Sequence, residues 1–212
     1  MKKGLFITFE GGEGTGKSTQ IKLFAEYLAR KDIPYSLTRE PGGSEGAEEI
    51  RSLLLKGAVD KWDKTTEMLL FTAARRDHLV KKIWPEINRG ITVVSDRFAD
   101  STKAYQGCGY GNDEKTLQTV ENLYHMIAGD FKPDLTFILD IDPKIGIMRS
   151  QKRAGNDEQR FEDMDLSFHE NLRAGFLQIA KSDPQRCVVV NADQTIENVH
   201  KDIVKGFVEK VK

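Results

Sequence analysis

Short apolar runs alternate along the chain with longer stretches in which apolar residues recur every three or four positions. The runs have the length of single strands, and the longer stretches have the periodicity of amphipathic helices. Runs that are apolar at consecutive positions, such as 137–139, are typical of strands covered on both faces. The pattern predicts strands at 5–10, 35–38, 91–96, 135–140 and 186–190.

Each predicted helix presents one apolar face. Pro143 is placed to open a helix after the fourth strand, because proline fits the first helical turn. Strands joined by helices predict the α/β class, with a doubly wound parallel sheet that binds ligands beyond the carboxyl ends of its strands. The apolar faces are Ile21, Phe24, Ala25 and Leu28; Leu117, Val120, Tyr124 and Ile127; Phe168, Leu172, Phe176 and Ile179; and Val199, Ile203 and Phe207.

The length of the chain and its uniform composition favour one domain. The 212 residues contain no internal repeat, low-complexity tract or linker rich in proline and serine, so we expect residues 1–212 to form a single domain. Nucleic-acid-binding domains usually carry a basic surplus, whereas 32 basic and 33 acidic residues give this chain a net charge of −1. The composition therefore favours a small-molecule ligand and no nucleic acid.

The cysteines and histidines have no spacing typical of a metal site. Cys108 and Cys187 lie far apart and the four histidines are scattered, so no zinc pattern can be assembled. Two separate cysteines are most simply reduced thiols of a cytosolic protein. The first apolar run is too short for a signal peptide, and no run reaches the length of a membrane span. We expect a cytoplasmic protein that does not enter a membrane.

The segment 11–18, Gly-Gly-Glu-Gly-Thr-Gly-Lys-Ser, matches the phosphate-binding pattern G-x-x-x-x-G-K-[ST] in full. It follows a predicted strand and precedes a predicted helix, which disfavours the alternative of an ordinary glycine-rich turn. In this pattern backbone N–H groups bind phosphates, Lys17 reaches the β- and γ-phosphates, and Ser18 holds Mg²⁺. The pattern predicts Mg·ATP binding but is shared by kinases, GTPases and motor ATPases. A guanine-specific N-K-x-D sequence is absent.

Two charged turns lie at the ends of predicted strands. Asp96 and Arg97 end the third strand, where the carboxylate can hold Mg²⁺ and the guanidinium can bind an anionic acceptor. A structural ion pair at a strand end is the alternative. Arg39 begins the turn Arg-Glu-Pro-Gly-Gly after the second strand, and we expect it to enter the same cleft. Together Arg39 and Arg97 predict a second anion site, separate from the ATP cradle.

Two further segments have candidate roles. Phe71 and Arg75 are four residues apart on one face of a predicted helix, so they could stack on a base and hydrogen-bond its edge, although a helical Phe is more often core. Beyond the fourth strand, a polar stretch interrupted by glycine carries charges that predict a flap closing over ATP, with a solvated loop as the alternative. These charges are Arg149, Lys152, Arg153 and Arg160.

The segments 9–19, 38–43, 70–75, 95–98 and 101–107 together resemble the thymidylate kinase family over nearly the whole chain. The resemblance implies an ATP-dependent, Mg²⁺-dependent phosphorylation of dTMP to dTDP, which serves dTTP synthesis. It implies the P-loop nucleoside monophosphate kinase fold, with five parallel strands in the order 2-3-1-4-5, a short lid at about 149–162, and a homodimer. The ATP-binding residues would be Gly11, Gly12, Glu13, Gly14, Thr15, Gly16, Lys17, Ser18, Thr19 and Arg149.

The same resemblance assigns the acceptor site. Phe71 would stack on thymine, Arg75 would hydrogen-bond the base edge, and Arg39 and Arg97 would bind the dTMP phosphate. The remaining acceptor contacts would be Glu13 near the sugar hydroxyl, Tyr105 against the sugar, and Thr102 and Gln106 in the base pocket.

The lid and two substitutions refine the resemblance. The acidic residue at position 13 and the arginines of the lid resemble the bacterial type, in which a lid arginine stabilises the transferring phosphoryl group. We assign that role to Arg153 and adenine stacking to Arg149. Phe98 stands where Tyr or His is commoner, which removes one polar contact, and Thr102 stands where some relatives carry Asn.

The predicted reaction is direct in-line transfer to a phosphate oxygen of dTMP. Lys17, a lid arginine and Mg²⁺ held by Ser18 and Asp96 would stabilise the charge, with Lys17, Asp96 and Arg153 as the catalytic residues. Two alternatives remain open. One is a kinase for another nucleoside monophosphate or for a deoxynucleoside, and a nucleoside kinase would need a base to deprotonate a hydroxyl. The other is a nucleotide switch or ATPase, which would need no acceptor.

Overall fold

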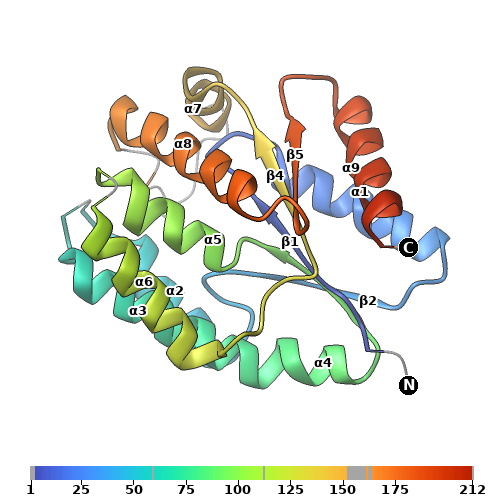
Figure 1. The fold of residues 1–212 in the computed structure, drawn as a ribbon, viewed down its shortest axis with the longest axis horizontal. Coiled ribbons are helices and arrows are strands. Elements are labelled where there is room, and N and C mark those ends of the chain that lie inside the picture. Colours follow the sequence, from blue (N-terminus) through green and yellow to red (C-terminus); the bar gives the residue numbers. More distant parts are fainter. Residues whose placement is uncertain (1–2, 59, 112, 152–160, 162–163, 212) are drawn as a thin grey trace.

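The computed structural model describes residues 3–58, 60–111, 113–151, 161 and 164–211. Five parallel strands form one sheet in the order β2-β3-β1-β4-β5 (Figure 1). The predicted class, strand number and order are therefore confirmed. The strands are β1 (Phe6–Glu10), β2 (Tyr35–Arg39), β3 (Thr92–Asp96), β4 (Leu135–Asp140) and β5 (Cys187–Asn191), and each predicted boundary lies within one residue of these.

Helices cover both faces of the sheet. The helices α1 (Lys17–Arg30) and α9 (Ile196–Lys210) pack together on one face (Figure 1). The other face is covered by α3 (Lys64–His78), α5 (Ala99–Thr102), α6 (Glu114–Ala128) and α8 (Leu166–Ser182). The remaining described helical segments are α2 (Glu45–Leu55), η1 (Leu79–Ile83), α4 (Trp84–Asn88), η2 (Lys103–Gly109) and α7 (Pro143–Gln151).

Phenylalanine rings form the centre of the core between the sheet and α1. Phe9 and Phe137 lie 5.2 Å apart across neighbouring strands, and Phe9 and Phe24 lie 5.7 Å apart between strand and helix. The predicted apolar faces of α1, α8 and α9 are buried, while in α6 only Val120 is fully buried and the other three positions are half-buried. The 3.6-residue pattern therefore identified the inward faces, and α7 begins at Pro143 as expected.

The strand β2 differs from its neighbours because it is the edge of the sheet. Its residues alternate between exposed and half-buried, whereas β1 is buried throughout. Since successive side chains of a strand point to opposite faces, Tyr35, Leu37 and Arg39 share one face and all three are exposed. This register decides where Arg39 points.

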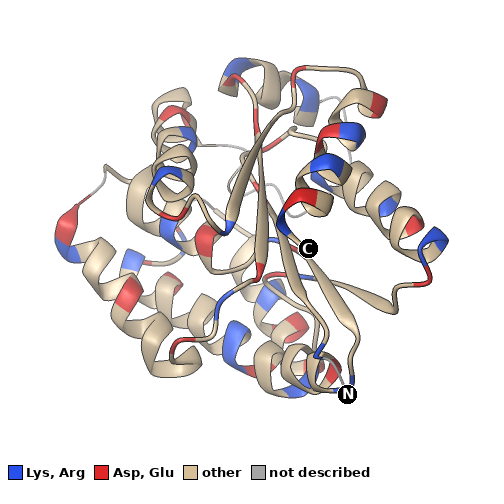
Figure 2. Ribbon diagram, turned by 45° about the vertical axis from the view of Figure 1, so that its right-hand side comes forward, with Lys and Arg blue, Asp and Glu red and all other residues tan. Residues whose placement is uncertain are grey.

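The outer surfaces of the helices carry interspersed charges of both signs (Figure 2). This mixture agrees with the net charge of −1. In the part of the chain that the structure describes, no helix combines the length and apolarity needed to cross a membrane. Arg153, Arg160 and most of the expected lid at 149–162 lie outside the described residues.

Candidate active site

The loop at 11–16 joins β1 to α1 and passes closely over other backbone. Gly14 has φ of +66°, and a Cβ there would lie 1.9 Å from the carbonyl oxygen of Gly146 in α7. Gly11 has φ of +132°, and its Cβ would lie 2.4 Å from the Leu139 carbonyl oxygen. Both positions therefore need glycine for conformation and for space. No side chain caps the N-terminus of α1 after Gly16, so that end of the helix is suited to an anion.

Lys17 is curled onto this loop. Its Nζ donates to the carbonyl oxygens of Gly11 at 3.0 Å and Gly12 at 2.8 Å, and to Thr15 Oγ1 at 3.3 Å. Burial, and then the charge of Arg97, lower the pKa of the ammonium to about 8. A cation so poorly solvated gains strongly from a phosphate placed beside it.

Ser18 and Asp96 form a pair of oxygen ligands at the mouth of the loop. Ser18 Oγ donates to Asp96 Oδ2 at 3.2 Å, across 78 positions of sequence. A hydroxyl and a carboxylate side by side fit Mg²⁺, which prefers oxygen and commonly takes its other ligands from phosphate and water. No cluster of three or more acidic, histidine or cysteine side chains suited to a metal occurs among the described residues. A two-residue site completed by a nucleotide is therefore the arrangement that this donor set supports.

Arg97 joins the loop to the acceptor side. Its backbone is left-handed, with φ of +69°, which is unusual for a residue with a side chain. Its Nη1 donates to the Gly11 carbonyl oxygen at 2.9 Å and to Ser101 Oγ at 3.1 Å. Gly11 thus accepts from both Lys17 and Arg97, which places the two cations on one atom.

Glu13 balances these cations. Its Oε1 accepts from Arg97 Nη2 at 2.9 Å and from the Tyr105 hydroxyl at 2.5 Å. Burial alone would raise the pKa of Glu13, but Arg97 and Lys17 outweigh burial and hold the pKa at about 2. Glu13 is therefore an anion at neutral pH, and it fixes the positions of Arg97 and Tyr105.

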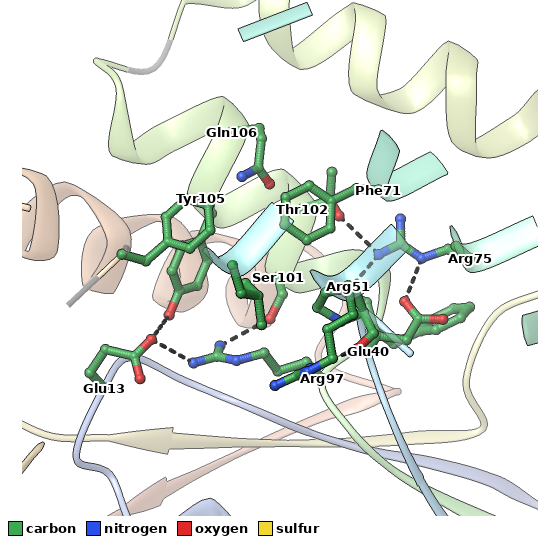
Figure 3. Close-up of a pocket in the computed structure, with 14 residues that line it drawn as sticks. Glu13, Glu40, Arg51, Phe71, Arg75, Arg97, Ser101, Thr102, Tyr105 and Gln106 are labelled. Carbon is green, nitrogen blue, oxygen red and sulfur yellow. Dashed lines mark hydrogen bonds and ion pairs between the residues drawn. The ribbon is translucent and has the colours of Figure 1, made fainter. Parts of the chain in front are cut away.

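A cavity of about 220 Å³ opens beside this network (Figure 3). Helix α3 supplies Phe71 and Arg75, the segment η2 supplies Tyr105 and Gln106, and the turn after β3 supplies Arg97. Seven of the eight side chains predicted to bind the acceptor line it: Glu13, Phe71, Arg75, Arg97, Thr102, Tyr105 and Gln106.

Arg39 is the exception, and the expectation that it shares this pocket is wrong. It is not part of the lining; its side chain is 54% exposed and pairs with Glu48 at 3.0 Å over a separate surface groove. The cause is the strand register, because Arg39 lies on the exposed face of the edge strand with Leu37. Arg51, from α2, lines the pocket instead, together with Arg75 and Arg97, and its Nη1 donates to the Pro41 carbonyl oxygen at 2.7 Å.

Comparison with known proteins identifies the family. The sequence model described as Thymidylate kinase matches residues 9–203. The chain is 47% identical to the thymidylate kinase of Caulobacter vibrioides over 211 residues, covering 100% of this chain and 99% of that one. It is 47% identical to the thymidylate kinase of Dinoroseobacter shibae over 201 residues, covering 95% of each. The chain belongs to the thymidylate kinase family. The crystal structure of thymidylate kinase from Ehrlichia chaffeensis superimposes with a TM-score of 0.77 at 37% identity, covering 97% of this chain and 99% of that one.

Sequence reasoning missed several polar residues of this thymidylate kinase site. In the sequence, Arg51 cannot be distinguished from the other charged residues of a surface helix, and Glu40 cannot be distinguished from an ordinary turn residue. Glu10 ends β1 and is fully buried; its two oxygens accept from the Phe98 N–H at 2.8 Å and from Ser101 Oγ at 2.5 Å. Burial, with Asp100 nearby, raises the pKa of Glu10 to about 8. The sequence feature that could have identified Glu10 is its position directly after an apolar run and directly before the glycines of the loop.

Phe98 has a structural explanation as a departure from the thymidylate kinase pattern. Its ring is fully buried and meets the ring of Phe6 edge-on at 4.8 Å. The Arg75 guanidinium carbon lies 5.2 Å from the Phe98 ring centre, which is a cation–π distance. Phe98 therefore supports Arg75 by packing. Phe71 is half-buried and contributes to the pocket wall, so it is not a fully enclosed core residue.

Arg149 lies near the end of α7, beyond the phosphate-binding loop. Its guanidinium donates to the Ala192 carbonyl oxygen at 3.1 Å and to Asp193 Oδ1 at 3.0 Å, in the connection between β5 and α9. A guanidinium fixed in this way keeps a planar face for a ring. Arg153, the residue predicted to stabilise the transferring phosphoryl group, lies outside the described residues, so its role remains a prediction.

Proposed function

We propose that the chain transfers the γ-phosphoryl group of Mg·ATP to dTMP, giving dTDP and ADP, by direct in-line attack of a dTMP phosphate oxygen. Membership of the thymidylate kinase family supports this activity. The carrying observation is the Gly11 carbonyl oxygen, which accepts from Lys17 on the ATP side and from Arg97 on the acceptor side. A donor phosphate bound by Lys17 and an acceptor phosphate bound by Arg97 would therefore lie on either side of the Gly11 carbonyl oxygen.

The acceptor phosphate binds to Arg97 with help from Arg51. Both guanidinium groups line the cavity, and a fork of N–H donors suits phosphate. A phosphomonoester is already an anion at neutral pH, so it needs positioning more than a general base. Glu13 holds Arg97 in place from the other side at 2.9 Å.

The sugar and base occupy the rest of the cavity. Tyr105, fixed by Glu13, packs against the deoxyribose and leaves little space for a 2′-hydroxyl. The half-buried ring of Phe71 stacks on the base, and Arg75, Thr102 and Gln106 meet its polar edge. The tilted contact of Phe71 with Phe161, at 6.3 Å between ring centres, supports a defined ring position.

Mg²⁺ accompanies ATP and is held by Ser18 and Asp96, whose oxygens already lie 3.2 Å apart. The ion would neutralise phosphate charge in this position. Lys17 turns from its backbone acceptors to the β- and γ-phosphates, and the N–H groups at the start of α1 bind the same anion.

In the lid, Arg153 stabilises the charge on the transferring group and Arg149 stacks on adenine. The location of Arg149 at the end of α7 supports the second role. Replacing each of Arg149, Arg153 and Arg160 with alanine separates the roles. Arg153→Ala should lower kcat by about a hundredfold or more, and a kcat within a few-fold of wild type would assign the role to another residue.

The organisation of the protein follows the family. Residues 1–212 act as one cytoplasmic domain that forms a homodimer. Exposed apolar side chains on the neighbouring helices α2, α3 and α6 support a dimer surface: Leu53, Leu69 and Met126 are 45%, 50% and 71% exposed. Light scattering after chromatography should give a dimer mass for the wild type and a monomer mass for Leu69→Glu.

The activity is tested by ADP release from Mg·ATP with a panel of nucleoside monophosphates and with thymidine. Selective turnover with dTMP is the expected result. Turnover with thymidine in place of dTMP would indicate a nucleoside kinase. ADP release that is independent of every acceptor would indicate an ATPase or switch and would overturn the proposal.

A further inference from the structure

Two side chains at the base end of the cavity are each hydrogen-bonded to a buried carboxylate. Arg75 Nε donates to Glu40 Oε2 at 2.8 Å, and Gln106 Nε2 donates to Glu67 Oε1 at 2.9 Å. Glu40 is 5% exposed and Glu67 is 1% exposed. Water has little access to either pair, so both hydrogen bonds constrain their partners strongly.

Three of the five N–H donors of Arg75 are occupied. Besides Nε on Glu40, its Nη2 donates to Thr102 Oγ1 at 2.9 Å and to the Phe98 carbonyl oxygen at 3.2 Å. Nη1 has no hydrogen-bond partner within the described part of the chain, and Figure 3 shows this nitrogen pointing away from Glu40. A guanidinium has no acceptor. Arg75 therefore offers a ligand N–H donors only, from one fixed position.

Glu40 is itself held from behind. Its second oxygen, Oε1, lies 3.0 Å from His78 Nδ1, and His78 Nε2 lies 2.6 Å from Thr38 Oγ1 on β2. His78 is fully buried. The chain from Thr38 through His78 and Glu40 thus ties the position of Arg75 to the edge of the sheet.

Glu67 fixes Gln106 in a different way. A glutamine amide can present either its NH₂ group or its carbonyl oxygen to a neighbour, whereas a carboxylate only accepts. Facing Glu67, Gln106 must turn its Nε2 toward the carboxylate. Its Oε1 is then directed to the other side, where Gln106 lines the cavity. Gln106 is therefore fixed as an acceptor.

A fixed donor beside a fixed acceptor matches one kind of pyrimidine edge. Thymine and uracil present a carbonyl oxygen at ring position 4 and an N–H at position 3, whereas cytosine presents an amino group and a bare nitrogen there. We infer that Glu40 and Glu67 are specificity-determining residues: Glu40 holds the donor Arg75 in one position and Glu67 orients Gln106 as an acceptor, and together they restrict the pocket to pyrimidines with a carbonyl at position 4. The inference rests on the proposed placement of the base between Arg75 and Gln106.

The test replaces each carboxylate with its amide, in Glu40→Gln and Glu67→Gln. In Glu67→Gln the new amide can donate as well as accept, so Gln106 can turn over. In Glu40→Gln the guanidinium of Arg75 loses its charged partner and is no longer held in one position. The measurement is kcat/KM for dTMP, dUMP and dCMP at saturating Mg·ATP. The dTMP:dCMP ratio should fall by about tenfold or more, because mispaired buried polar groups cause the rejection of dCMP. The dTMP:dUMP ratio should stay constant, because the two bases share this edge.

The two ratios distinguish a loss of hydrogen-bonding specificity from a general loss of packing in the pocket. If the carboxylates only support the fold of the pocket, kcat/KM for all three nucleotides falls together and both ratios are unchanged, which overturns the inference. Glu86→Gln is the matched control: Glu86 is a partly buried carboxylate that pairs with Lys82 at 3.1 Å outside the pocket lining, and both ratios should be unchanged. If Glu40→Gln does not fold, as judged by circular dichroism, Glu67→Gln decides alone.

Two further variants distinguish this inference from the proposed function. Arg75→Ala and Gln106→Ala remove the base-facing groups themselves. If both leave the dTMP:dCMP ratio unchanged, the proposed base contacts are wrong. If both lower the ratio while Glu40→Gln and Glu67→Gln do not, the base contacts stand and only the role of the carboxylates is refuted.

Discussion

The phosphate-binding loop is made by one continuous segment, whereas the acceptor pocket is made by side chains from six separate parts of the chain. In the loop, the contacts of Lys17 are mostly with backbone carbonyl groups at 11 and 12. In the pocket, two arginines pair with carboxylates: Arg97 with Glu13, and Arg75 with Glu40. The loop therefore depends on backbone shape, and the pocket depends on pairs of charges.

This difference governs how each region responds to substitution. Gly11 and Gly14 of the loop have backbone atoms only 2.4 and 1.9 Å from the position of a Cβ, so the loop is sensitive to added volume at these two positions. A residue of the pocket is constrained by its partner, so removing one charge leaves another buried and unpaired. The following variants test the contrast, in order of expected effect.

The largest effect is expected for Lys17→Ala. Without this ammonium, no side chain of the loop would neutralise the transferring phosphate, and kcat should fall by about a thousandfold or more. Steady-state assay with dTMP and Mg·ATP measures this. The KM for dTMP should change little, because Lys17 belongs to the donor side. A near-normal kcat would contradict the assignment of the loop.

The second variant, Arg97→Ala, should affect both regions. It removes a donor to the Gly11 carbonyl oxygen and leaves half-buried Glu13 without its ion-pair partner. We expect kcat/KM for dTMP to fall by about a hundredfold. Arg97→Ala should also raise the pKa of Glu13, because Arg97 is the foremost influence lowering it. NMR titration of the Glu13 carboxyl carbon checks this, and an unchanged titration would show that the pair is not coupled.

Arg51 and Arg39 form a matched pair for the acceptor phosphate. Arg51 lines the pocket and Arg39 lies over a different groove. Arg51→Ala should raise the KM for dTMP by about tenfold, as expected for one charge-assisted contact, while Arg39→Ala should change it less than threefold. If Arg39→Ala has the larger effect, the side chain must reach the pocket in the complex, and the exposed position would not describe the bound state.

The smallest effect is expected for Glu10→Gln, measured as stability against urea. The pKa of Glu10 is raised from its ordinary 4.5 to about 8, so between these values the folded protein binds more protons than the unfolded chain. The wild type should therefore lose stability from this group as the pH rises through that window, by at most about 1.4 kcal/mol per pH unit.

Glu10→Gln cannot ionise and should not show this loss. The difference in the free energy of unfolding between Glu10→Gln and wild type should move in favour of the variant from pH 5 to pH 7.5. Parallel pH profiles would show that Glu10 does not carry the effect.

The sequence predicted most of the loop and part of the pocket, for physical reasons that differ. Glycine spacing and the flanking strand and helix determine the loop locally, so Lys17 and Ser18 could be assigned without a structure. Arg39 could not, because its direction depends on the edge position of β2 and on the extension of this strand one residue beyond its predicted end, to Arg39 itself. Glu67 is one acidic residue among many, and only the approach of Gln106, 39 positions away, identifies it.

The shared acceptor at Gly11 has a consequence for how nucleotides enter. Two like charges held on one oxygen repel each other, and the fold maintains this crowding before any ligand arrives. An incoming phosphate on either side draws one cation away and relieves the repulsion felt by the other. The cleft is thus electrostatically primed for anions, and the rate of nucleotide association should fall steeply as ionic strength rises.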